Sequence, residues 1–205
     1  PECYEPCMDT GETNPLLATE GLPHFDTIRP EHVVPGMQTL LAELGRDVDR
    51  LEASAAPAWA AVVAPLEALT DRLQRAWGTV GHLMGVKNSD ALRAAHEAVQ
   101  PEVVTFSLRL GQSRPIYQAL KGLQASAGLD ATERRIVDAL VRDAELAGVG
   151  LEGEARERFN AIQMELAELS TAFSNHVLDA TKAFALTLTT ADEVGGLPAS
   201  LRALA

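Results

Sequence analysis

The sequence predicts an all-α fold: an antiparallel stack of several helices with one short strand near the C-terminus. Apolar residues recur at steps of three and four over most of the chain, which is the spacing of one face of an α-helix. Proline and glycine residues separate these segments at positions that suit helix ends and connections. The hydrophobic content of 46%, with 22% charged residues, is typical of a globular protein and argues against a disordered chain.

Residues 1–29 are predicted to form an extended leader, and residues 30–205 a helical domain. Prolines and glycines in the leader exclude a long helix, but its apolar residues from Asn14 onward predict packing along the body. Cys3 and Cys7, the two cysteines of the chain, lie in this leader. Their spacing is half of a metal site or a small disulfide loop, but no second pair completes a zinc tetrahedron. Two unpaired thiols are the favoured interpretation.

Two long helices are predicted to follow the leader. The first begins at Pro30, a residue that suits the first helical position, and ends before Pro57. The second ends at the turn that starts with Lys87. Their apolar stripes comprise Val33, Met37, Leu40, Leu41, Leu44, Val48 and Leu51 in the first helix, and Val62, Leu66, Leu69, Leu73, Trp77, Val80 and Leu83 in the second.

A third helix is predicted over residues 90–111, with Ser89 as its N-cap. Pro101 in its middle predicts a kink or a split. A short helix near residues 114–124 follows. A further helix is predicted to begin at Asp130 and to end near Ala147. Glu133, three positions after Asp130, gives the spacing of a capping box.

The longest helix is predicted over residues 153–183. Its apolar residues alternate steps of three and four, the period of a helix packed lengthwise against antiparallel neighbours. Residues 184–190 alternate differently and include β-branched residues, which predicts a strand. Because one strand cannot satisfy its own backbone groups, its partner is expected outside these residues or in the leader.

Charge and hydropathy exclude two classes of partner. The net charge of −12 repels phosphate backbones, so no nucleic acid is expected to bind. No apolar run approaches the roughly 20 residues of a membrane span, so no membrane is expected as a partner. The chain begins at Pro1 rather than Met, which is expected for a processed product or an excised piece.

One segment partly matches the helix of a zinc peptidase. That helix needs H-E-x-x-H, in which two imidazoles one turn apart bind the metal and the glutamate activates water. His96 and Glu97 begin correctly, but Gln100 stands in place of the second imidazole. A solvated helix face is therefore predicted here. No catalytic, cofactor-binding or metal-binding residue is predicted in the chain.

The other four histidines suggest no active site. His24 and His32 lie at the junction of leader and first helix, where capping or packing is expected. His82 lies close to an apolar stripe and is predicted to be partly buried with its hydrogen bonds satisfied. His176 could pair with Asp179, but a His–Asp pair without a nucleophile is not a catalytic triad.

Six aromatic residues are interpreted mainly as core or interhelix positions, with an aromatic peptide-binding wall as the alternative. They are Trp59, Trp77, Phe106, Tyr117, Phe159 and Phe173. Motifs for phosphate loops, dinucleotide binding and a serine nucleophile elbow are absent from the sequence.

Short sequence blocks in a fixed order carry a resemblance to a known family. They are Asn14-Pro15-Leu16-Leu17, Leu22-Pro23-His24-Phe25, residues 28–35, residues 77–89, Leu108-Arg109-Leu110-Gly111-Gln112-Ser113, residues 169–182 and Gly196-Leu197-Pro198. Together the blocks resemble the start of oligopeptidase A enzymes, in the thimet oligopeptidase family of zinc metallopeptidases. The block at 109–113 is most similar to the plant and green-algal branch.

This resemblance implies the neurolysin/thimet oligopeptidase-like N-terminal domain of a larger enzyme. It implies that the chain forms one wall of a substrate channel, that zinc is held in the missing catalytic domain, and that neither cofactor nor metal is held by this chain. Partners implied are that catalytic domain and short peptides, including cleaved targeting peptides. The implied compartment is intracellular: the cytosol, the chloroplast stroma or the mitochondrial matrix. Two alternatives are a stand-alone helical peptide-binding adaptor and one half of a split peptidase.

Overall fold

The computed structural model describes residues 14–204, which form two compact units: the residues up to Ala167, and those from Glu168 onward. All regular structure in this range is helical, which confirms the predicted all-α fold. None of its helices is long and apolar enough to cross a membrane. The predictions for Cys3 and Cys7 fall outside the described residues.

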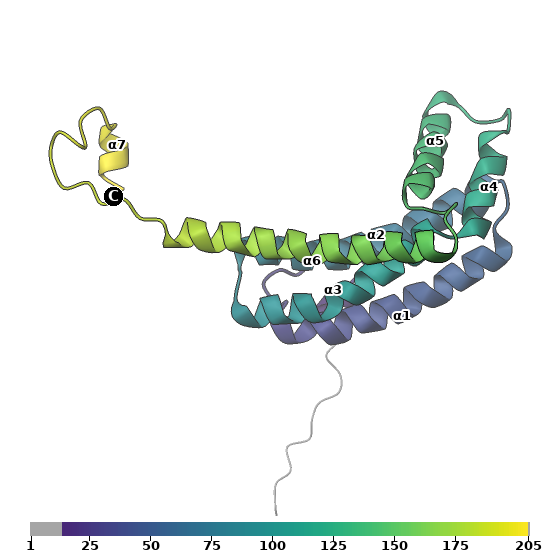
Figure 1. The fold of residues 1–205 in the computed structure, drawn as a ribbon, viewed down its shortest axis with the longest axis horizontal. Helices are drawn as coiled ribbons and strands as arrows, with labels where there is room; N and C mark the ends of the chain where they lie inside the picture. Colours follow the sequence, from purple (N-terminus) through teal and green to yellow (C-terminus); the bar gives the residue numbers. More distant parts are fainter. Residues whose placement is uncertain (1–13, 205) are drawn as a thin grey trace, which may run out of the picture. The chain divides into compact units, whose positions relative to one another are not determined.

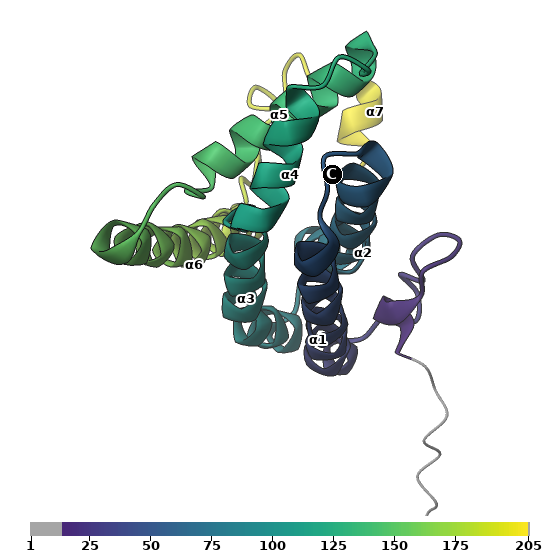
Figure 2. The same ribbon diagram turned by 90° about the vertical axis from the view of Figure 1, so that its right-hand side faces the viewer.

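Three long helices form the centre of the first unit: α1 (Pro30–Ser54), α2 (Trp59–Val86) and α3 (Asp90–Gly111). They run in alternating directions, with α1 packed against both of the others (Figures 1 and 2). The predicted stripe of α1 is buried at every position except Leu41, which is half-buried. α3 runs through Pro101 as one helix, so it is not split. The central core is therefore built from periodic faces visible in the sequence.

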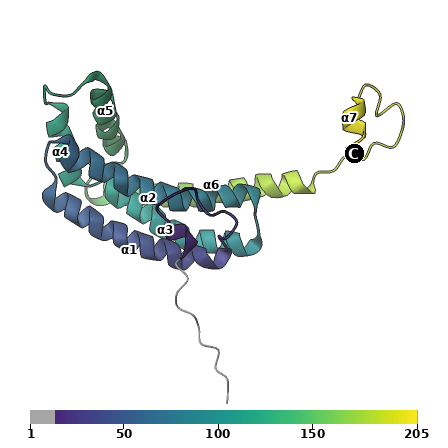
Figure 3. The ribbon, with the colours of Figure 1, turned by 180° about the vertical axis from the view of Figure 1, so that it is seen from behind.

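Two shorter helices, α4 (Arg114–Gln124) and α5 (Ala131–Leu146), pack against each other near the junction of α1 and α2 (Figure 3). Side-chain caps fix where they begin. The Ser113 hydroxyl accepts a hydrogen bond from the Ile116 backbone, and Asp130 and Glu133 form the predicted capping box. These caps act within a few residues of the start of each helix.

The segment before α1 packs on the central helices (Figure 2). It contains the short 3-10 helix η1 (Pro15–Leu17), and its residues Leu16 and Ile28 are buried. The Arg75 guanidinium of α2 donates hydrogen bonds to the backbone carbonyls of Ala18, Glu20 and Gly21 at 2.6–3.1 Å. These bonds fasten an otherwise irregular segment to α2.

The helix α6 (Gly153–Ala183) begins in the first unit and continues into the second, which also contains α7 (Ala199–Arg202). No residue of α6 is buried. The prediction that its apolar residues pack lengthwise against neighbours is wrong for Ile162 and Leu166, which are exposed within the first unit. The steps of three and four between the apolar residues of α6 correctly predict a helix. Such a stripe does not show whether a partner covers it.

The predicted strand over residues 184–190 is also wrong, because no strand occurs within residues 14–204. A strand needs a neighbouring backbone to accept and donate its hydrogen bonds, and no segment among residues 14–204 pairs with this one in that way. Instead, the backbone N–H groups of Thr189 and Thr190 both donate to the Glu193 carboxylate at 2.9 Å. These bonds to the backbone hold the pKa of Glu193 below its ordinary value.

Candidate functional site

The partial zinc-peptidase motif at His96 does not form a metal site. The His96 ring is buried and stacks on Trp77 of α2, with ring centroids 4.5 Å apart. The Gln100 side chain donates a hydrogen bond to the Ala167 carbonyl at 2.9 Å. Over residues 14–204, no group of three or more His, Cys, Asp or Glu side chains is arranged to hold a metal ion. These residues do not fit a zinc centre, and the expectation that His96 faces solvent is wrong.

Burial of His96 predicts that the free energy of unfolding depends on pH. Its Nδ1 atom is buried without a hydrogen-bond partner. Burial lowers the pKa of His96 below the ordinary 6.5, against a smaller opposing effect of the Glu97 carboxylate. The unfolded chain therefore binds this proton more readily than the folded chain. The contribution of His96 to stability is present above pH 6.5 and is lost as the pH falls through the pKa of the folded state.

The variant His96→Phe keeps a ring on Trp77 and removes the unsatisfied nitrogen. We expect it to raise the free energy of unfolding at neutral pH by about 1 kcal/mol and to flatten this part of the pH profile. Urea unfolding followed by circular dichroism on both sides of pH 6.5 measures the effect. His176→Gln, at an exposed position on α6, is the control and should keep the parent profile. Equal pH profiles for His96→Phe and the parent would contradict the inference that burial of His96 makes the free energy of unfolding depend on pH.

The other histidines near the start of the chain have structural roles. The Nδ1 atom of His32 accepts a hydrogen bond from the Arg29 backbone N–H at 3.0 Å, which confirms the predicted capping role. His24 is exposed and its carbonyl accepts turn hydrogen bonds. His82 is exposed and contacts the edge of Phe25, with ring centroids 5.3 Å apart. Its predicted partial burial is therefore wrong.

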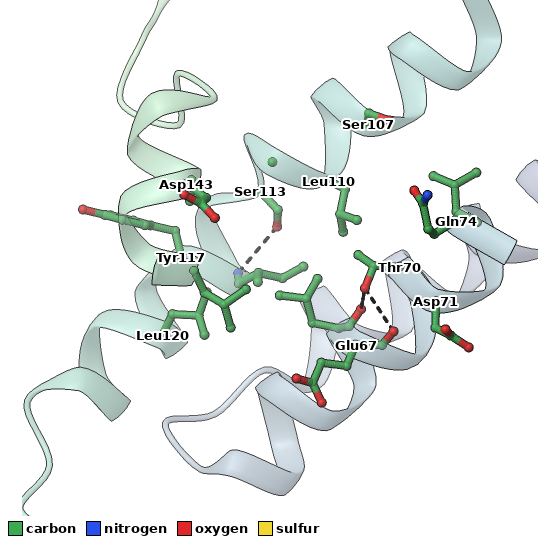
Figure 4. A pocket seen from close by; sticks show the side chains of 16 residues that line it. Glu67, Thr70, Asp71, Gln74, Ser107, Leu110, Ser113, Tyr117, Leu120 and Asp143 are labelled. Atoms are coloured by element: carbon green, nitrogen blue, oxygen red, sulfur yellow. Dashed lines mark hydrogen bonds between the residues drawn. The ribbon is translucent and has the colours of Figure 1, made fainter. Parts of the chain in front are cut away.

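A cleft of about 680 Å³ lies between α2, α3, α4 and α5, wholly within the first unit (Figure 4). This volume is within the range of about 300 to 1,000 Å³ usual for ligand pockets. The lining comes from the middle of α2, the end of α3, the first turns of α4 and the last two turns of α5. Among the aromatic residues considered above as a peptide-binding wall, Tyr117 lines it, whereas Phe106 is buried in the core.

The floor of the cleft is apolar. Leu73 of α2, Leu110 of α3 and Leu140 of α5 are half-buried there, and fully buried residues of α2 and α4 complete it. In Figure 4, Leu110 points from α3 towards α2. The Tyr117 hydroxyl donates a hydrogen bond to Glu145 Oε1 at 2.8 Å. That bond raises the pKa of Tyr117 and holds its ring at the side of the cleft.

The rim of the cleft is acidic. Glu67 and Asp71, one turn apart on α2, and Asp143 of α5 are all exposed. No lysine or arginine lines the cleft. Neighbouring cations are engaged elsewhere: Arg72 pairs with carboxylates on α1, and Arg114 pairs with Glu152. The cleft therefore combines an apolar floor with negative charge that no cation of its lining neutralises.

A second feature is the exposed apolar face of α6, here called the α6 stripe. Its members are each at least 42% exposed: Ile162, Leu166, Leu169, Phe173 and Val177. Their steps of three and four place them on one side of the helix. Contiguous apolar surface of this kind usually marks an interaction site.

Comparison with known proteins finds matches over most of the chain. The family model described as "Neurolysin/Thimet oligopeptidase, N-terminal domain" matches residues 37–156, a range that contains the cleft. "Probable cytosolic oligopeptidase A" and "Organellar oligopeptidase A, chloroplastic/mitochondrial", both of Arabidopsis thaliana, are each 46% identical over 94% of this chain, which corresponds to 28% and 25% of their own lengths. "Oligopeptidase A" of Escherichia coli is 39% identical over 94% of this chain and 29% of its own length. The chain thus spans little more than a quarter of these relatives.

Proposed function

Because the chain belongs to the neurolysin/thimet oligopeptidase family, we propose that it is the non-catalytic N-terminal helical domain of a zinc oligopeptidase. The observation that carries this proposal is the match of residues 37–156 to that domain. In the whole enzyme, the remaining polypeptide would hold the zinc ion, which would supply activated water for the hydrolysis of short peptides. The names of the two Arabidopsis relatives support a cytosolic or organellar location.

The α6 stripe supports the proposal that this domain docks on the remaining polypeptide. Phe173 is 70% exposed, and its neighbours Leu169 and Val177 are at least half exposed. Burying such a side chain contributes about 1.5 to 3 kcal/mol. A partner that covers the α6 stripe would therefore strongly stabilise the complex it forms with this domain. Nearly three quarters of each Arabidopsis relative lies outside the part that this chain matches. This unmatched remainder would supply a docking partner within the same polypeptide.

In this arrangement the domain forms one wall of the substrate channel. It contributes surface that contacts peptides, and its cleft between α2 and α5 is the surface best shaped for that role. Short peptides, including cleaved targeting peptides, are the proposed substrates of the whole enzyme. The chain itself performs no chemical step.

A chimera tests the proposed function. This chain replaces the matching N-terminal part of the Arabidopsis cytosolic relative, and hydrolysis of a quenched fluorescent peptide is measured with and without a zinc chelator. We expect the chimera to be active and chelator-sensitive, and this chain alone to be inactive. A folded chimera without activity would contradict the proposal, as would turnover by the isolated chain.

A further inference from the structure

We propose that the cleft between α2, α3, α4 and α5 binds a peptide segment that carries both apolar and basic side chains. The inference takes from the proposed function only that the ligand is a peptide. Everything else rests on the chemistry of the cleft itself.

The floor determines the apolar part of the ligand. Half-buried leucines from three helices, Leu73, Leu110 and Leu140, present hydrocarbon surface to solvent in a concave site of about 680 Å³. Covering that surface with an aliphatic or aromatic side chain removes it from water, which is favourable in proportion to the area covered. A wholly polar ligand would leave this hydrocarbon surface exposed to water.

The rim determines the charge of the ligand. Glu67 and Asp71 form no ion pair with any residue of 14–204, and both residues line the cleft from α2 (Figure 4). Asp143 lines the cleft from α5 and pairs with the adjacent Arg142 at 3.5 Å. An arginine or lysine of the ligand, lying over the leucines, would reach either side of this rim. An acidic ligand would be repelled by the carboxylates of the rim.

The hydroxyl groups that line the cleft are already hydrogen-bonded within the chain. The Thr70 hydroxyl donates to backbone carbonyls of its own helix, and the Ser113 hydroxyl caps α4 (Figure 4). Selectivity therefore comes from the apolar floor and the acidic rim. This combination suits amphipathic basic peptides and disfavours acidic ones.

Fluorescence anisotropy with the purified chain tests the proposal. The probes are three labelled peptides of equal length, in which leucine alternates with arginine, glutamine or glutamate. We expect the arginine peptide to bind at least about tenfold more tightly than the glutamate peptide. The preference should shrink as salt rises from about 0.05 to 0.5 M, because exposed charges are screened.

Two variants locate the site. Glu67→Gln combined with Asp71→Asn should weaken the arginine peptide about fivefold, the effect expected for two exposed ion pairs, and leave the glutamine peptide unchanged. Leu140→Ser should weaken the arginine and glutamine peptides alike, with circular dichroism confirming that the chain stays folded. The control, Glu157→Gln combined with Glu165→Gln, removes two exposed carboxylates of α6 and should have no effect.

Three outcomes would overturn the proposal. They are equal affinity for the arginine and glutamate peptides, equal weakening by the rim variant and its control, and self-association of the chain through the cleft in place of peptide binding. An active chimera in any of these cases would leave the proposed function standing. An inactive chimera together with selective peptide binding would leave only the cleft proposal standing.

Discussion

Replacing Leu169 on α6 by serine is expected to leave the isolated chain as stable as before and to destabilise the chimera by about 3 kcal/mol. Leu169 is 57% exposed in the chain, and substitutions at such surface positions usually change the free energy of unfolding by less than about 0.5 kcal/mol. If the remaining polypeptide covers the α6 stripe, the same leucine is buried in the chimera. Truncating a buried leucine usually costs about 2 to 5 kcal/mol.

Thermal unfolding of both proteins, with and without the substitution, measures this difference. The matched control is Leu146→Ser at the end of α5, where the leucine is 70% exposed and lies outside the stripe. It should change neither protein appreciably. An equally small effect of Leu169→Ser in the folded chimera would show that the α6 stripe is not the docking face.

Leu44→Ala is expected to lower the free energy of unfolding of the chain by about 3 kcal/mol. Leu44 lies in the middle of α1, is fully buried, and belongs to the core shared by the three central helices. Its truncation removes apolar contacts and leaves a cavity that the surrounding long helices cannot fill completely. Since domains of this size are stable by about 5 to 15 kcal/mol, the loss is a large fraction of the total.

Urea unfolding followed by circular dichroism gives the measurement. Leu166→Ala on α6 is the matched control, because the same atoms are removed from a side chain that is 50% exposed. We expect this control to shift the free energy of unfolding by no more than about 0.5 kcal/mol. Similar losses for Leu44→Ala and Leu166→Ala would mean that α6 belongs to the same core as α1.

The helices were predictable because their signals are local. Proline at the start of α1, the Ser89 cap of α3 and the Asp130 capping box of α5 each act within a few residues, and the structure has helices at all three places. The alternation at 184–190 was a local signal too, but a strand also needs a distant backbone to pair with. The same sequence therefore predicted a strand that did not form.

The cleft could not be predicted from the sequence. Its residues come from four helices and span positions 66 to 144, and each one resembles an ordinary helix-face residue when it is considered alone. Of the six aromatic residues considered as a peptide-binding wall, Tyr117 lies in the cleft through the packing of α4 on α5. His96 shows the opposite error: because Gln100 replaces the second imidazole of a zinc motif, His96 was expected on a solvated helix face, but it is buried and stacks on Trp77.

From its amino acids alone, this chain could be assigned an all-helical fold, the ends of its helices and its family, since periodicity, caps and ordered sequence blocks are properties of neighbouring residues. Only the tertiary structure decided which apolar faces are buried. The stripes of α1 and α6 have the same spacing, yet Leu44 is enclosed and Phe173 is 70% exposed. The physical reason is that a helix face is buried only when a second surface packs against it. The sequence of one helix describes its own face but not the surface that covers it.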